Sequence, residues 1–171
     1  IRDRLGTIDQ LLVTPMATIS IMIGKAIPPV LVGLLQSTIV LAVSCFFFKI
    51  PFSGSLVLLY FGLVLFATGI VGIGLCISIV AKNMQQAMLY SFTVLMPMIL
   101  LSGFATPIRA MPEIFRCLTY LNPVRYAVEF CQRVFLEGAP LESVATLLFA
   151  LLLIAVGSFL FSLLLFRRKL S

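Results

Sequence analysis

Few residues of this chain could carry chemistry, and their spacing does not form a catalytic or metal site. The sequence has 4 Cys and no His, and the cysteines lack the paired spacing of zinc ligands. It also lacks a GxxxxGK[ST] run, the P-loop pattern that cradles nucleotide phosphates. We therefore expect no catalytic residue, no bound metal and no cofactor in this chain.

Three glycines have a spacing that resembles part of a dinucleotide-binding pattern. They lie inside an apolar run, with no preceding strand and no acidic partner, so that interpretation fails. Small residues instead let membrane helices approach one another closely. Gly69, Gly72, Gly74 and Ser78 therefore predict a helix contact, in which Gly74 and Ser78 form a small-xxx-small pair.

The composition is typical of an integral membrane protein. Of the 171 residues, 61% are hydrophobic and 11% are charged, whereas soluble domains have about 45–50% apolar and about 25% charged residues. Such a chain has too few charges to cover a surface that faces water, which excludes a soluble globular domain and a disordered chain. No basic face is interleaved with stacking aromatics, so we expect no nucleic-acid partner.

Four apolar stretches predict helices that cross a membrane. A spanning helix needs about 20 mostly apolar residues, and unbroken runs of Leu, Ile, Val and Phe fit helices better than barrel strands. The stretches are residues 26–48, 55–81, 86–104 and 143–166, of which the third is barely long enough. The predicted fold is all-α, a polytopic bundle with four transmembrane helices.

The positions of Lys and Arg predict the orientation of this bundle. With four spans, both ends of the chain and the short turn at Lys82 lie on one side. This side carries the basic excess, whereas the arginines of residues 105–142 are matched by glutamates. Basic excess marks the cytoplasmic side, so we expect both ends of the chain to be cytoplasmic.

The chain is expected to be the C-terminal part of a longer protein, because it opens at Ile1 without a leader. Its predicted organisation has four parts. Residues 1–25 form a cytoplasmic helix and elbow, and residues 26–104 form three spans. Residues 105–142 form an amphipathic segment on the outer side, and residues 143–171 form the last span and a basic tail.

Residues 7–15 predict a short helix before the first span. Thr7 and Gln10 match a capping box, Asp9 suits the first turn, and Pro15 ends the helix because it restricts the residue before it. A second helix is expected to continue into the first span. A helix of two turns is unstable alone in water, so it lies either on lipid or against a partner protein.

Residues 105–142 predict two amphipathic helices of roughly 10–15 residues. Pro112 suits the start of the first, and Asn122 followed by Pro123 suits the start of the second. The charged residues 125, 129 and 133 are four apart and predict pairing along the helix. This segment either supports packing or gates an exit, and a disulfide between Cys117 and Cys131 stays open.

The predicted spans contain no Asp, Glu or His. Ion-coupled transporters usually place such groups in the membrane, so the energy for any transport is expected to come from elsewhere. Hydroxyls, amides and aromatic rings in the spans suit an amphiphilic or hydrophobic cargo. Residues that could line its path are Gln36, Thr38, Ser91, Phe92 and Phe104.

Several blocks of the sequence together resemble the ABC-2 type permeases of bacterial ABC exporters. The most specific block runs from Gly6 to Pro15, with Asp9 where that family usually has Glu. Further similar blocks are residues 24–25, 51–55, 85–87, 101–104, 107–112, 121–126 and 166–169. The similarity covers nearly the whole chain and is strongest to permeases of multidrug exporters.

This resemblance implies a type II exporter-like permease in a bacterial inner membrane, with two spans before this chain, a second permease copy and two ABC ATPase subunits that bind the ATP. The short helix would be the coupling helix that docks on the ATPase, formed by Thr7, Asp9, Gln10, Leu11, Leu12, Thr14 and Pro15. Residues 105–142 would be a re-entrant helix pair, with an outer gate at Asn122, Pro123, Arg125 and Tyr126.

The resulting hypothesis is a permease subunit of an ATP-driven exporter, which moves a drug-like molecule or lipid out of the cytoplasm by alternating access. Its expected partners are the ATPase, the second permease copy and membrane lipids. Two alternatives stay open. One is an ion-coupled secondary transporter or channel, and the other is a membrane scaffold that transports nothing.

Overall fold

The computed structural model describes residues 15–104 and 107–170, and every regular element in these two ranges is a helix. The elements are α2 (Pro15–Phe46), α3 (Leu56–Val80), α4 (Met84–Leu100), a 3-10 turn (Ile108–Ala110), α5 (Glu113–Thr119), α6 (Pro123–Phe135) and α7 (Leu141–Leu170). The predicted all-α class is confirmed for this part of the chain.

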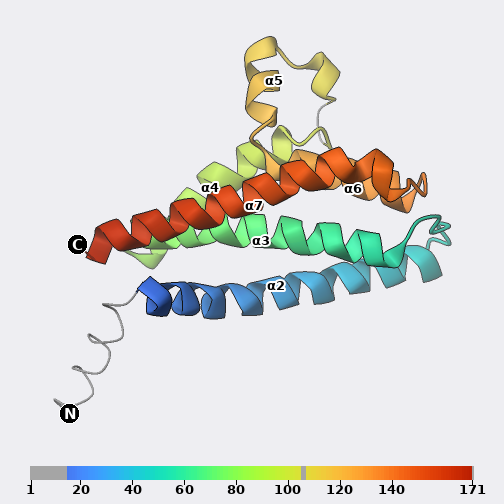
Figure 1. The fold of residues 1–171 in the computed structure, drawn as a ribbon. Helices are drawn as coiled ribbons and strands as arrows, with labels where there is room; N and C mark the ends of the chain where they lie inside the picture. The colour runs from blue at the N-terminus through green and yellow to red at the C-terminus, as the bar shows by residue number, and fades with distance from the viewer. Residues whose placement is uncertain (1–14, 105–106, 171) are drawn as a thin grey trace.

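The three longest helices lie side by side, with α3 between α2 and α7 (Figure 1). The start of α2, the α3–α4 turn and the end of α7 lie at one end of the bundle, which we call the α3–α4 end. The α2–α3 and α6–α7 connections lie at the opposite end, which we call the α2–α3 end. Helix α5 stands away from the bundle, whereas α6 runs along α7.

Among the described residues, three helices are long and apolar enough to cross a membrane, which confirms three of the predicted spans by length and composition. They cover Ile19–Phe46, Leu56–Val80 and Leu141–Arg168. The first begins within α2, which stays helical through Pro28 and Pro29. The continuation of a helix through residues 18–25 into the first span is therefore also confirmed, with a start at Pro15.

The remaining predicted span, at residues 86–104, is shorter than expected. Helix α4 has 17 residues, or about 25 Å at 1.5 Å per residue, against about 30 Å of hydrocarbon. It ends at Leu100 because Ser102 bonds locally: its hydroxyl donates to the Ile99 carbonyl (2.6 Å) and accepts from Phe104 N–H (3.3 Å). Gly103 then adopts a positive φ of 88°, which favours glycine.

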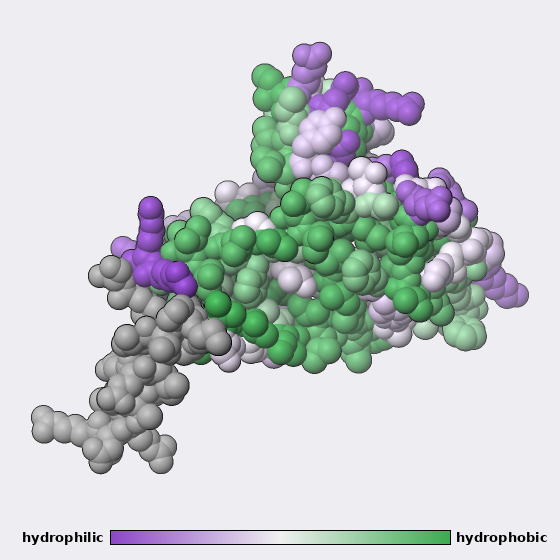
Figure 2. All heavy atoms as spheres, viewed as in Figure 1, coloured by the Kyte–Doolittle hydropathy of each residue, from purple (hydrophilic) through white to green (hydrophobic). Residues whose placement is uncertain are grey.

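The surface matches a bundle surrounded by lipid. Figure 2 shows hydrophobic residues over the long helices, with hydrophilic residues confined to the two ends of the bundle and to the protruding α5 segment. Large apolar side chains on α2 and α4, such as Leu35 and Phe92, are exposed. In water such a surface would drive association, so the structure supports a multi-pass membrane protein.

The core lies where α3, α6 and α7 meet. Phe130 of α6 is 1% exposed and is surrounded by Leu59, Val144 and Leu147. It fits because Gly62 on α3 has no side chain: a Cβ there would lie 2.1 Å from Phe130 Cε1. Helix α6 is therefore packed along the bundle and does not lie across its end.

Close packing of α3 on α7 uses two of the glycines expected at a helix contact. A Cβ on Gly69 would touch Ala155, and one on Gly72 would lie 2.5 Å from Ser158 Oγ. The Ser158 hydroxyl also donates to the Gly69 carbonyl (3.2 Å). The expected close approach at Gly74 is not found among the described residues, because a Cβ there has nothing within 4 Å.

The predicted amphipathic helices of residues 105–142 are both present, with the first shorter than expected. Helix α5 has 7 residues because tight i→i+3 bonds end it, including Tyr120 N–H to the Cys117 carbonyl (3.2 Å) and Asn122 N–H to the Thr119 carbonyl (3.1 Å). Helix α6 has 13 residues and begins at Pro123 as predicted.

Candidate functional site

Most of the predicted coupling helix lies outside the described residues. This applies to Thr7, Asp9, Gln10, Leu11, Leu12 and Thr14, so their predicted roles remain predictions. Pro15 is the first residue of α2, a position that suits proline because its missing N–H has no helical partner there. Since α2 is one continuous helix from Pro15 to Phe46, a displacement of its first turn would be carried into the span.

The residues predicted for a cargo path lie in separate places. Gln36 lines a cavity of about 540 Å³ between α2, α3 and α6, together with Ser37 and Ser44. Thr38 contributes to the α2–α3 contact, because its hydroxyl is 2.6 Å from the Tyr60 hydroxyl. This half of the predicted path is therefore one mostly apolar cavity with a few polar side chains, beside a cross-helix hydrogen bond.

The α4 residues form a second surface. Ser91 and Phe92 line a shallow groove of about 380 Å³ that is bounded by α4 side chains alone. The Ser91 hydroxyl donates to the Ala87 carbonyl (2.8 Å). Phe104 follows the end of α4 and is exposed. The structure thus places Gln36 apart from Ser91, and does not join the five residues into one path.

The four predicted gate residues do lie together, at the junction of α5 and α6, which we call the α5–α6 joint (residues 119–126). Asn122 is 5% exposed and caps α6, accepting from Val124 N–H (3.0 Å). Its amide also donates to the Met98 carbonyl of α4 (2.6 Å). This one side chain therefore starts α6 and fastens it to α4.

Arg125 is the charged group of the joint. Its Nη1 donates to the Thr119 hydroxyl, and its guanidinium lies 4.5 Å from the centre of the Tyr120 ring and 5.9 Å from that of Tyr126. The Tyr126 hydroxyl in turn donates to the Tyr120 carbonyl (2.9 Å). Cation–π contacts of this kind favour a buried guanidinium.

The predicted charge pairing along α6 is only half correct. Arg133 and Glu129 form an ion pair at 2.6 Å, as their spacing suggested. Arg125 does not join it, because its side chain turns towards Thr119 and Tyr120. Among the residues that the structure describes, Arg125 has no carboxylate partner.

Sequence reasoning missed Thr119 and Tyr120, two members of the joint. It also missed the Met98 carbonyl, which accepts the hydrogen bond from Asn122. Thr119 is fully buried, and its hydroxyl also donates to the Arg116 carbonyl (2.7 Å). Tyr120 supplies a ring and a carbonyl. Their place directly before the Asn-Pro cap was the available signal, since a chain reversal there brings residues 119 and 120 back over the first turn of α6.

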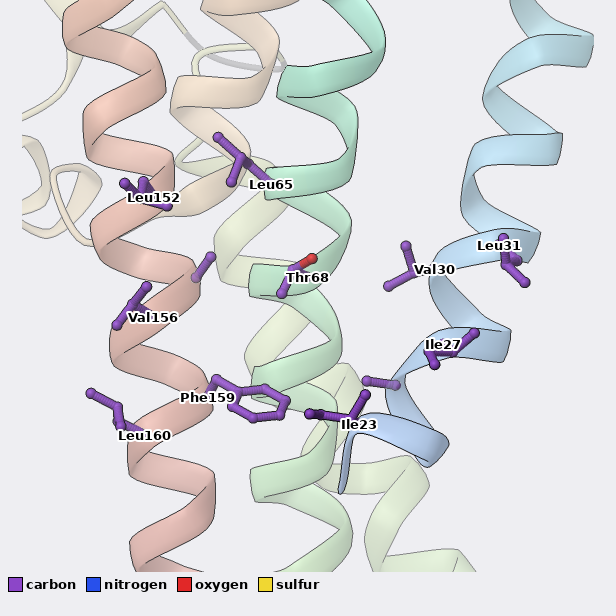
Figure 3. A pocket seen from close by; sticks show the side chains of 12 residues that line it. Ile23, Ile27, Val30, Leu31, Leu65, Thr68, Leu152, Val156, Phe159 and Leu160 are labelled. Atoms are coloured by element: carbon purple, nitrogen blue, oxygen red, sulfur yellow. The ribbon is translucent and has the colours of Figure 1, made fainter. Parts of the chain in front are cut away.

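A further cavity was not predicted at all. It has about 580 Å³ and lies between α2, α3 and α7 (Figure 3), where side chains of the three helices face one another. Thr68 is its one polar lining residue, and the Thr68 hydroxyl is already bonded to the Val64 carbonyl (2.8 Å). The cavity suits apolar chains, and small residues such as Ala26 and Ala155 leave its space open.

The cysteines do not form a bonded or ligand-holding group in the described part of the chain. Cys117 and Cys131, whose pairing was left open, both carry free thiols. Within residues 15–104 and 107–170, no three His, Cys, Asp or Glu side chains gather as a metal site would require. The interactions that these residues offer are therefore binding by shape, hydrogen bonds and the guanidinium of Arg125 at the joint.

Comparison with known proteins identifies similar chains. The ABC-2 type transporter family matches residues 2–136. The "Probable multidrug ABC transporter permease YbhR" of Escherichia coli (strain K12) is 42% identical over 164 residues, 96% of this chain and 45% of that protein. YbhS, with the same description and organism, is 36% identical over 146 residues, 84% of this chain and 39% of that protein.

A third relative is the "Inner membrane transport permease YhhJ" of the same organism. It is 32% identical over 168 residues, which are 97% of this chain and 45% of that protein. The chain therefore spans less than half the length of these relatives. No solved structure matches it.

Proposed function

The chain belongs to the ABC-2 type transporter family, and from this premise we propose that it is part of the permease subunit of an ATP-driven exporter. One observation carries the proposal beyond the family name. The three spanning helices are long and apolar, and the predicted spans at residues 26–48, 55–81, 86–104 and 143–166 contain no Asp, Glu or His, so these stretches lack the groups by which ion-coupled carriers take up energy.

The proposed cargo is an amphiphilic or hydrophobic molecule, such as a drug-like compound or a lipid. Support comes from the two cavities beside α2. One is apolar and lies between α2, α3 and α7, and the other carries Gln36, Ser37 and Ser44. A molecule with an apolar body and a polar head matches such walls, whereas a small hydrated ion would lose its water without replacement.

The proposed mechanism is alternating access driven from the cytoplasmic side. Closure of an ATPase pair on ATP would displace residues 7–15, and α2 would transmit this motion because it runs unbroken from Pro15 to Phe46. Leu11 and Leu12 would supply the apolar docking contact, Thr7 and Gln10 would hold the short helix, and Asp9 would add a polar contact.

The proposed topology places the α3–α4 end in the cytoplasm of a bacterial cell. Lys25, Lys82, Arg167 and Arg168 belong to segments at this end, and basic residues favour the cytoplasmic side. In this arrangement α4 and the turn that follows it make the remaining crossing, between those of α3 and α7. Helices α5 and α6 form a re-entrant pair that opens and closes an exit at the α5–α6 joint.

The proposed partners are an ABC ATPase and a second permease copy, identical or different. The exposed face of α4, which is rich in Met and Phe, is the surface that we assign to the second copy. An apolar face can lie in lipid, but the shallow groove along it gives a neighbouring helix a place to pack.

The test uses the full-length protein produced together with its ATPase. We expect Leu11→Asp to abolish co-purification of the ATPase or to uncouple ATP hydrolysis from efflux, because a buried charge would break an apolar contact. Val13→Asp is the matched control, since position 13 lies off the stripe that Ile8, Leu11 and Leu12 form at helical spacing.

Two results would reject the proposal. Efflux that continues without any ATPase activity would indicate an ion-coupled carrier or channel. A Leu11→Asp variant with normal ATPase binding and normal efflux would show that residues 7–15 lie free on lipid and drive nothing.

A further inference from the structure

The α5–α6 joint holds a guanidinium whose charge has no partner in the described part of the chain. Arg125 forms no ion pair there, since Glu129 is taken by Arg133. Its position in the first turn of α6 adds to the imbalance, because a helix N-terminus is itself the positive end of the helix dipole.

The unpaired part of Arg125 is one particular edge of the guanidinium. Nη1 donates to Thr119, whereas among the described residues Nε is buried without an acceptor and Nη2 makes no hydrogen bond. A buried donor without an acceptor costs free energy. Nε and Nη2 form the fork by which an arginine can bind a carboxylate or phosphate, and because Nε is covered by protein atoms, Nη2 is the part of this fork that a ligand can reach.

The joint also lies deep relative to the α2–α3 end. Ser53 N–H donates to the Phe135 carbonyl (3.4 Å), so α6 ends at the α2–α3 end and begins deeper in the bundle. Phe130 packs on Gly62, six residues into α3, and Arg125 lies five residues further down α6. Together these offsets place Arg125 about 16 Å below the start of α3, at 1.5 Å per residue.

Apolar surface adjoins this charge. Leu121 is 81% exposed, and Phe115 and Leu118 of α5 are each about half exposed. An unpaired guanidinium beside an apolar shelf matches a ligand that has an anionic head and a hydrophobic tail. A free inorganic anion would use Nη2 and leave the shelf uncovered.

We propose that the α5–α6 joint binds the phosphate or carboxylate head of an anionic amphiphile through Nη2 of Arg125, with its tail on the apolar face of α5. The inference deepens the proposed function and rests on it for the placement of the joint within the membrane. Thr119, Tyr120 and Tyr126 act as positioning residues, since they hold the guanidinium plane and leave Nη2 available.

The experiment measures binding of phosphatidylglycerol to the full-length protein, purified with its ATPase in dodecyl maltoside and titrated by native mass spectrometry. We expect Arg125→Met to weaken binding about tenfold or more, the effect of losing a charged hydrogen bond. Arg125→Lys keeps the charge but loses the fork, and should fall between the two. Arg133→Met, which removes a paired arginine of the same helix, should bind as the native protein does.

Two further probes separate the possible ligand sources. Diacylglycerol, which has the tails without the phosphate, should bind equally weakly to native protein and Arg125→Met. Inorganic phosphate alone should bind far more weakly than phosphatidylglycerol, and equal binding would overturn the assignment to an amphiphile. Equal phosphatidylglycerol binding by Arg125→Met and Arg133→Met would overturn the site itself.

These readouts are independent of the proposed transport function. ATPase co-purification is scored in the same samples, and Arg125→Met is expected to retain it because the proposed function assigns ATPase docking to residues 7–15 and not to the α5–α6 joint. Loss of lipid binding in Arg125→Met, with the ATPase retained, therefore supports a lipid site at the α5–α6 joint. Loss of the ATPase after Leu11→Asp supports the proposed docking of residues 7–15 on the ATPase.

Discussion

At the scale of single residues, α6 is held in the bundle by places where a side chain is missing. Gly62 leaves the space that the Phe130 ring fills, and Gly54 lets the α6 backbone pass at Val134. Protein interiors are packed so closely that one added methyl group changes the stability of the fold. The position of α6 therefore depends on two residues that make no side-chain contact of their own.

The first prediction concerns Gly62. Replacement by Ala places a Cβ 2.1 Å from Phe130 Cε1, and overpacking of this kind costs about 1–3 kcal/mol. We expect a lower temperature of thermal unfolding in detergent. Gly74→Ala is the matched control, because its Cβ meets nothing within 4 Å and Ala is the better helix former by about 1 kcal/mol. Equal melting of the two variants would contradict the packing described.

At the scale of elements, the junction between α4 and α6 depends on Asn122. Its side-chain oxygen caps α6 and its amide nitrogen holds the Met98 carbonyl. That carbonyl lies in the last turn of α4, where backbone acceptors lack helical partners. The Asn122 side chain thus supplies hydrogen-bond partners to backbone groups at the start of α6 and at the end of α4.

The second prediction separates these two roles. Asn122→Ser keeps a capping oxygen but loses the donor to Met98, so we expect a loss of about 0.5–1.5 kcal/mol, the worth of one hydrogen bond. Asn122→Ala loses the cap as well, which adds about 0.5–2 kcal/mol. Thermal unfolding of both variants checks the order. If Asn122→Ser is as stable as the native protein, the bond to Met98 contributes nothing.

The elements differ in how far their sequence predicts them. Helices α3 and α7 follow from long apolar runs, and Asn122-Pro123 predicts the start of α6, because these are local signals. The end of α4 was missed because a side-chain turn at Ser102 overrides an apolar run. Phe130 and the turning of Arg125 towards Thr119 depend on contacts between elements, which the spacing along one helix does not reveal.

At the scale of the whole molecule, charge and helix direction agree. The start of α2, the α3–α4 turn and the end of α7 share one end of the bundle (Figure 1), and the basic segments lie there. The arrangement of the helices was thus predictable from three long hydrophobic runs and the positions of Lys and Arg. The protrusion of α5 was not, because nothing local fixes where a seven-residue helix points.

The third prediction tests this arrangement in cells. In a full-length background without native cysteines, Cys introduced at Lys82 should react with a membrane-impermeant maleimide only after the inner membrane is opened. Cys introduced at Glu137, in the connection at the α2–α3 end, should react from outside. Labelling of both positions from the same side would show that the assigned orientation is wrong.

The short length of α4 also has a consequence for the lipids around it. Helices α2, α3 and α7 present a long apolar surface to the lipid, whereas α4 ends at Leu100 and presents a shorter one. A bilayer adjusts to such a difference in hydrophobic length by becoming thinner beside the shorter helix. We therefore expect the bilayer to be thinner beside α4 than beside the three longer helices, by an amount that grows as the acyl chains of the host membrane lengthen.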